Sequence, residues 1–218
     1  MKNACRNTSI VVLTWLTVSS AAGAGLLNGD FEAPVEPGFG VNFSVPPAGF
    51  VWNLAFGNIE QVTSAYWQPS SGDQSLDLSG SDAGAIYQDF TFSSSGAWNI
   101  RFDLSANPDL FTRGDGMGSG FKTVRVDFGT PGLMTTLGTY SLDSAPRSIS
   151  DMMWVTMTTP EIVVSDSVTY RLQFTSLDPG NAGPCLDNVQ LQSVPEPGSV
   201  ALLCSGLMVL FLHRRQRR

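Results

Sequence analysis

The sequence predicts an all-β fold, an antiparallel β-sandwich or jelly roll, for the middle of this 218-residue chain. Three observations lead to it. Apolar and polar residues alternate with period two along many short segments. Gly, Pro, Ser, Asn and Asp fill the gaps between those segments. No stretch between the two ends shows the 3.6-residue period of an amphipathic helix. We therefore expect two packed sheets, each with one apolar face.

The alternation predicts where each strand lies along the chain. In residues 97–104, for example, Trp98 and Ile100 face one side while Asn99 and Arg101 face the other. The same pattern gives about ten strands, near residues 26–32, 50–56, 58–66, 74–79, 85–92, 97–104, 121–128, 135–142, 153–164, 168–176 and 185–192. Two Gly-rich loops, 35–49 and 106–120, either line a ligand site or lack fixed structure.

The first 24 residues have the three parts of an export signal. A basic start with Lys2 and Arg6 precedes an apolar run over 10–18, and the small residues 22–24 form a cleavage site. We predict a signal peptide over 1–24, so that the mature chain begins at Gly25. A buried N-terminal helix is the alternative, but the apolar run is short and is followed at once by Gly and Asn.

Charge excludes one class of partner. Between residues 25 and 194 there are eighteen acidic and six basic side chains, a net charge of −12. Such a surface repels phosphate backbones, so nucleic-acid binding is not expected.

Few residues of the mature region are suited to catalysis. The only histidine, His213, lies in the C-terminal tail, so neither a Ser-His-Asp triad nor a histidine zinc site can form in the domain. Cys185 is the only cysteine between residues 25 and 193, and we expect it to be buried. Paired carboxylates of a glycosidase remain possible, but we predict that the protein is not an enzyme.

The C-terminal residues 194–218 read "VPEPGSVALLCSGLMVLFLHRRQRR". We expect the apolar run over 200–212 to form a short transmembrane helix, with the arginines behind it on the cytoplasmic side. This order resembles the PEP-CTERM sorting signal, also called the ice-binding-protein C-terminal domain. The resemblance implies that an exosortase recognises Pro195, Glu196 and Pro197 and removes the helix. It also implies transient anchoring in the inner membrane, then transfer to the cell surface or extracellular matrix. A plain single-span anchor is the alternative.

A second resemblance covers the predicted β-sandwich domain, residues 25–193. The segments "NGDFE", "WQPSSGDQSLDLSGSDAGAIYQDF", "FDLSANP" and "GPCLDNVQL" follow the order seen in the choice-of-anchor C family and its plant cell-wall relatives. These are galactose-binding-like jelly rolls, akin to carbohydrate-binding modules. The resemblance implies a structural Ca²⁺ where the first and last strands meet, held by Asp30, Glu32 and Asp187, with further oxygens from the loop at 72–73. The alternative is that the two aspartates only make turn and edge hydrogen bonds.

Aromatic side chains are the candidates for sugar contacts, because their faces stack on the apolar faces of pyranose rings. We expect two of them to be exposed: Tyr87, because its parity is opposite to that of Ile86 and Phe90, and Trp67, because it stands at a strand end before residues 68–73; Trp98 belongs to the core. The sequence thus predicts an exported, non-catalytic protein that binds carbohydrate, with exopolysaccharide or cell-wall glycan as partner. A purely structural matrix protein is the second hypothesis, and a carbohydrate-active enzyme is the third.

Overall fold

The computed structural model describes residues 25–108 and 120–195. The predicted signal peptide and transmembrane helix lie outside these residues, as does most of the Gly-rich loop 106–120. Within the described part, every element is a β-strand, and no helix is long and apolar enough to cross a membrane.

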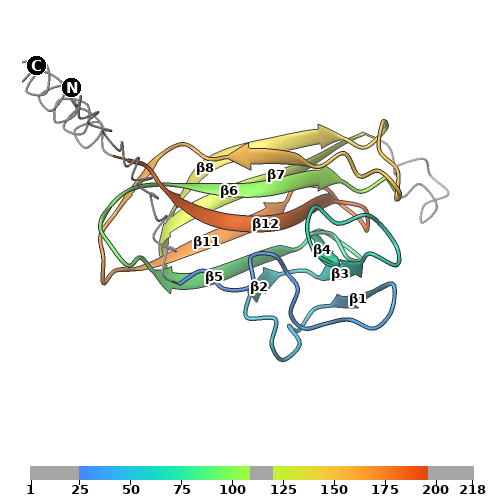
Figure 1. The fold of residues 1–218 in the computed structure, drawn as a ribbon, viewed down its shortest axis with the longest axis horizontal. Helices are drawn as coiled ribbons and strands as arrows, with labels where there is room; N and C mark the ends of the chain where they lie inside the picture. The colour runs from blue at the N-terminus through green and yellow to red at the C-terminus, as the bar shows by residue number, and fades with distance from the viewer. Residues whose placement is uncertain (1–24, 109–119, 196–218) are drawn as a thin grey trace, which may run out of the picture.

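Two antiparallel sheets pack face to face (Figure 1). The seven-stranded sheet has the order β1-β3-β4-β12-β6-β10, and β9 also pairs with β6. Its strands are β1 (Gly40–Phe43), β3 (Ile59–Thr63), β4 (Gln74–Asp77), β12 (Pro184–Ser193), β6 (Gly96–Ala106), β10 (Ile162–Val164) and β9 (Val155–Thr158). The five-stranded sheet has the order β2-β5-β11-β7-β8, formed by β2 (Asn53–Phe56), β5 (Ala85–Thr91), β11 (Thr169–Ser176), β7 (Phe121–Thr130) and β8 (Leu133–Asp143).

The main core lies between the two sheets, where alternate residues of facing strands meet. From β6, Trp98, Ile100 and Phe102 point inward, and from β11, Leu172 and Phe174 meet them. All five are at most 2% exposed. The period-two pattern therefore has its physical cause in this shared apolar layer, and the predicted all-β sandwich is confirmed.

The strand predictions are wrong at the first segment. Residues 26–32 do not form a strand, because Asn28 and Phe31 have positive φ angles of 49° and 55°. The segment still lies beside the last strand, since the Val189 N–H donates to the Gly29 carbonyl at 2.7 Å. The Gln88 side-chain amide replaces a strand neighbour by bonding both the N–H and the carbonyl of Leu27.

Two further strand boundaries differ from the prediction. The segment predicted near 153–164 is split into β9 and β10, because Thr159 and Pro160 interrupt the pairing with β6. The Gly-rich loop 35–49 contains the short strand β1, which pairs with β3. The Gly-rich composition of this segment does not favour a strand, and β1 forms because it pairs with β3.

A second, smaller cluster covers the outer face of the seven-stranded sheet. Val62 of β3 and Cys185 of β12 point away from the main core and pack against Trp67 and Met152 from two loops. Cys185 is fully buried, as expected. The loops 64–73 and 144–154 therefore form a third layer, and the hollows described below lie at its rim.

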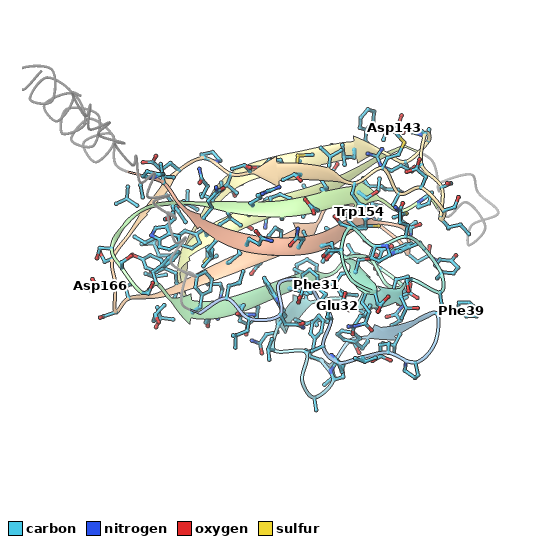
Figure 2. All side chains as sticks on the ribbon, viewed as in Figure 1. Phe31, Glu32, Phe39, Asp143, Trp154 and Asp166 are labelled. Carbon is cyan, nitrogen blue, oxygen red and sulfur yellow. The ribbon has the colours of Figure 1, made fainter. Side chains whose placement is uncertain are left out.

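The two ends of the described chain lie at the same end of the sandwich (Figure 1). Gly25 approaches Thr91 at the end of β5, and the Val194 N–H donates to the Ala97 carbonyl at the start of β6. Phe39 lies at the opposite end of the molecule from Asp166 (Figure 2). The third-layer loops and the chain ends are thus separated by the length of the sandwich.

Candidate functional site

Asp187, one of the residues predicted to hold calcium, accepts hydrogen bonds from backbone N–H groups. Its carboxylate accepts hydrogen bonds from the N–H of Ser70 at 2.9 Å and of Ser71 at 3.0 Å. A third bond comes from the N–H of Asn188 at 2.7 Å. Oδ2 therefore anchors the last strand, β12, to the loop between β3 and β4, while Oδ1 bonds the next residue of β12 itself.

Glu32 contacts the same loop a few residues further on. Its Oε1 atom accepts hydrogen bonds from the N–H groups of Asp73 and Gln74, each at 2.9 Å. Gly72, with a φ of +59°, makes this approach possible, since a Cβ atom there would lie 2.2 Å from the same oxygen. Glu32 and Asp187 thus both bind backbone N–H groups of the loop between β3 and β4, at neighbouring positions.

The predicted calcium site is not assembled by these contacts. Asp30 is exposed, and the described residues contain no group of three His, Cys, Asp or Glu side chains that could hold a metal ion. The loop at 72–73 supplies N–H donors to Glu32, whereas Ca²⁺ requires six to eight oxygen ligands. Calcium therefore stays a prediction, and the geometry of the three residues gives it no support.

Asp187 faces Asp103 across the β12–β6 pairing, and the two carboxyls have opposite pKa shifts. Burial raises the pKa of Asp187 to about 7, and the nearby Asp103 charge adds to the effect. Burial also acts to raise the pKa of Asp103, but hydrogen bonds from Ser70, Thr156 and Asn188 outweigh it and the pKa falls below 3.8. Since Asp187 is fully buried and Asp103 is 7% exposed, this pair serves the sheet and is closed to a substrate.

Trp67 is not the exposed sugar platform that its position at a strand end predicted. Its side chain is 2% exposed, and the indole Nε1 donates to Ser75 Oγ at 2.8 Å. A strand end is exposed in a fold of two layers, but here loops add a third layer and bury Trp67 against Val62 and Cys185.

Tyr87 lies on the outer face of the five-stranded sheet, far in the fold from Trp67 on the other sheet. It is half-buried, and the Arg171 guanidinium lies 3.7 Å from the centre of its ring. Arg171 is itself fixed by two hydrogen bonds to the Asp89 carboxylate, at 2.6 and 2.7 Å. One face of the Tyr87 ring is therefore engaged in a cation–π contact, and the structure does not bring Tyr87 and Trp67 together.

A different aromatic pair, Phe39 and Tyr66, lines a hollow of about 280 Å³ at the end of the sandwich that carries the third-layer loops. Their rings meet edge to face with centroids 6.5 Å apart, and they are 70% and 39% exposed. Polar side chains complete the lining, namely those of Glu60, Asn107 and Asn181. An exposed aromatic wall thus stands beside amide and carboxylate groups, the combination by which pockets orient polar ligands.

Thr63, the last residue of β3, holds both aromatic residues in place. Its N–H donates to the Phe39 carbonyl at 3.0 Å, and its hydroxyl donates to the Gly38 carbonyl at 2.6 Å. Its own carbonyl accepts from the N–H groups of Tyr66 and Trp67, at 2.9 and 3.2 Å. One buried residue therefore fixes the relative position of two loops, so the wall is preformed.

Asp77 lies beneath the polar side of this hollow and holds Asn107. The Asn107 side-chain amide donates to Asp77 Oδ2 at 2.6 Å, while the N–H groups of Ser79 and Gly183 also donate to the carboxylate. Burial raises the pKa of Asp77 to about 7, against the lowering effect of these donors. The protonation state of Asp77 therefore bears on the hydrogen bond that positions Asn107 in the lining.

Part of this hollow was within reach of the sequence. The Gly-rich loop 35–49 was one of two loops expected to line a ligand site or lack fixed structure, and it supplies Phe39. Tyr66 is one of the aromatic residues that could contact a sugar, but the sequence favoured its neighbour Trp67, which stands at the end of a predicted strand. No local sequence pattern marked Glu60 and Asn107 as site residues. They meet only in the folded chain, where β3 pairs with β4 and Asn107 follows the end of β6.

Comparison with known proteins bears first on the tail. Residues 193–218 match the PEP-CTERM protein-sorting motif. The chain therefore carries a PEP-CTERM sorting signal at its C-terminus, which indicates an exported protein. Pro195 is exposed, and Glu196 and Pro197 lie outside the described residues.

The remaining likenesses concern the domain. Halomucin of Haloquadratum walsbyi is 28% identical over 148 residues, which is 67% of this chain but 1% of that protein, so the chain spans a very small part of the curated relative. Similar solved structures include a family 35 carbohydrate-binding module from Clostridium thermocellum, with 14% identity, 71% of this chain and 92% of that chain covered, and a TM-score of 0.39. A CBM35 from Paenibacillus barcinonensis shares 14% identity over 71% of this chain and 99% of that chain, with a TM-score of 0.43. A CBM6 module of Cellvibrio mixtus lichenase 5A, in complex with cellotriose, shares 13% identity over 63% of this chain and 88% of that chain, with a TM-score of 0.40.

Proposed function

We propose that this protein is displayed outside the cell and binds a neutral saccharide in the hollow lined by Phe39 and Tyr66. The observation that carries the proposal is the exposed aromatic pair beside Glu60, Asn107 and Asn181. Aromatic rings offer an apolar surface for the C–H face of a pyranose, and the carboxylate and amides suit its hydroxyl groups. The net charge of −12 over residues 25–194 disfavours uronic-acid polymers.

The proposed role is binding without turnover. The two carboxyl groups whose pKa is raised to about 7, Asp77 and Asp187, are fully buried and cannot reach a ligand in the hollow. Among the described residues that line the hollow, Glu60 is the only carboxylate, whereas glycosidases use a pair. Incubation with labelled oligosaccharides should release no product; release that Glu60→Gln abolishes would make the protein an enzyme.

Binding is tested by Tyr66→Ala in the full-length chain, purified in a detergent without a sugar headgroup. We expect the affinity for neutral oligosaccharides on a glycan array to fall by about tenfold or more, as for an aromatic anchor. Tyr87→Ala, which removes the ring on the other sheet, is the matched control and should leave the affinity unchanged. The reverse result would move the site to the Tyr87 face, and no binding by the unaltered chain would favour a purely structural matrix role.

The proposed location follows from the sorting signal. We propose that residues 194–218 hold the chain transiently in the inner membrane until an exosortase acts at Pro195, Glu196 and Pro197. The domain then passes to the surface or the extracellular matrix, where exopolysaccharide or cell-wall glycan is its partner. Pulse-labelling in a strain with and without exosortase tests this step, and identical tail retention in both strains would contradict it.

A further inference from the structure

A second hollow, of about 430 Å³, adjoins the first and has a different chemistry. The two hollows share Tyr66 and Trp67 as lining residues. The second is also bordered by the apolar residues Pro69 and Ile149 and by the polar residues Ser64, Gln68 and Ser150. None of the described residues that border this second hollow is charged, whereas the charged Glu60 and the polar Asn107 line the first hollow. Tyr66 thus stands between a polar hollow and an apolar one.

The walls of this apolar hollow are tied to each other. The Gln68 N–H donates to the Ile149 carbonyl at 2.9 Å, which joins the loop 64–73 to the loop 144–154. The Trp154 indole Nε1 donates to the Gln68 carbonyl at 2.8 Å and adds a second link. A turn closes the loop tip, where Ser148 and Asp151 exchange backbone hydrogen bonds at 3.0 and 3.1 Å. The hollow is therefore held open as a shape that a ligand does not need to create.

The Ile149 side chain remains 47% exposed although it borders this hollow. A ligand that covers such an apolar side chain with apolar surface is stabilised, because both surfaces leave water. A bare pyranose has hydroxyl groups on most of its carbons and would leave Ile149 and Pro69 against polar atoms. A small apolar substituent on the sugar would match them, while the serine hydroxyls at the rim suit the polar atoms of its linkage.

We propose that the ligand is a neutral sugar that carries an acyl substituent, an N-acetyl or O-acetyl group, and that the substituent occupies the hollow bordered by Pro69 and Ile149. The inference rests on the proposed function and specifies it further: the ring of the sugar lies on the Glu60 side of Tyr66, and the acyl group lies on the Ile149 side. The negative net charge of the domain repels acidic sugars and leaves neutral ones, acylated or not, free to bind.

The test compares neutral oligosaccharides in pairs that differ in acylation, on the full-length chain in a detergent without a sugar headgroup. Chitotetraose and cellotetraose form the first pair, since they share the β-1,4-linked glucose backbone and differ in the acetamido group. Acetylated and alkali-treated xylan form the second pair and test the O-acetyl group. We expect the acylated member to bind about tenfold more tightly, with the difference measured by calorimetry.

Ile149→Ser removes the apolar wall but keeps the backbone carbonyl that bonds Gln68. It should abolish the preference for the acylated member and leave the affinity for the other member unchanged. Val163→Ser is the matched control, because Val163 is 79% exposed on β10, whose neighbour Asp166 lies at the end of the molecule opposite Phe39 (Figure 2). It should retain the full preference.

The outcomes separate this inference from the proposed function. Equal affinity within each pair, together with a loss of both affinities in Tyr66→Ala, would overturn the acyl preference and keep saccharide binding. Preference that survives in Ile149→Ser would place the acyl group elsewhere and overturn the inference as well. Absence of binding to every member would overturn both.

Discussion

Burial controls the protonation of two carboxyl groups, Asp77 and Asp187, and this has a consequence for stability. The pKa of each is raised from 3.8 to about 7 by desolvation. Both groups bind a proton more tightly in the folded chain than in the unfolded one. Their contribution is therefore fully present below about pH 4 and is lost as the pH rises through about 7, at about 1.4 kcal/mol per pH unit and group.

We expect the melting temperature to be higher at pH 5 than at pH 8, as measured by differential scanning calorimetry. Asp77→Asn should make this pH dependence shallower by removing one of the two groups. The same variant should be less stable at both pH values, because an amide cannot accept from Asn107, Ser79 and Gly183 together. A melting temperature that rises steadily from pH 5 to pH 8 would contradict the assignment.

The calcium hypothesis can also be tested at the scale of single residues. Asp187 accepts three N–H donors and Glu32 accepts two, so both residues are satisfied without an ion. We expect an excess of EGTA at constant pH to leave the melting temperature unchanged. A fall that Ca²⁺ restores and Mg²⁺ does not would show that an ion replaces these N–H donors, as the family resemblance implies.

Among the elements, the end of β3 determines the shape of the proposed site, because Thr63 bonds the loops that carry Phe39 and Tyr66. Thr63→Val keeps the volume and the backbone bonds but removes the hydroxyl that donates to the Gly38 carbonyl. We expect a loss of about 1 kcal/mol in the free energy of unfolding. Saccharide affinity should fall several-fold, since Phe39 is then less well positioned.

Thr63→Ser restores a hydroxyl donor and is the matched control for this element. It should recover most of the affinity, even though it lacks the methyl group and packs less well. If valine and serine reduce the affinity equally, packing rather than the hydrogen bond positions the loop, and the role assigned to the hydroxyl is wrong.

The same elements show what the sequence could predict. Strands such as β6 and β11 were found because their alternation is a local pattern that reflects burial on one side. β1 was not found, since its residues are at most half-buried and its pairing with β3 is non-local. The third layer was missed for a related reason. Its buried residues, Trp67 and Met152, lie in loops, where no period relates sequence position to the side that is covered.

At the scale of the whole molecule, the proposed site and the end of β12, where the sorting motif begins, lie at opposite ends of the sandwich. Phe39 marks one end (Figure 2), and β12 leaves the fold at the other (Figure 1). A chain held by its C-terminal tail would therefore present the Phe39–Tyr66 hollow away from the membrane. This arrangement leaves the hollow accessible both before and after removal of the tail.

The sorting motif begins directly at the folded domain. The last backbone hydrogen bond of β12 joins the Val194 N–H to the Ala97 carbonyl at 2.8 Å, and Pro195 is the next residue. A membrane protease that binds the motif therefore needs either an active site with room for the adjacent domain or the separation of the end of β12 from β6. Breaking one such bond costs about 1 kcal/mol, which corresponds to about a fivefold change in the population of the open end.

A spacer between the domain and the motif distinguishes protease access beside an intact β12 from opening of the end of β12. We expect six Gly and Ser residues inserted between Val194 and Pro195 to speed removal of the tail by about fivefold, measured by pulse-chase labelling in the exosortase-containing strain. The same six residues inserted between Ser93 and Ser94, in an exposed loop, control for the insertion itself and should leave the rate unchanged. Equal rates for the spacer variant and the unaltered chain would show that the protease reaches the motif beside an intact β12, and that the domain imposes no barrier on its own release.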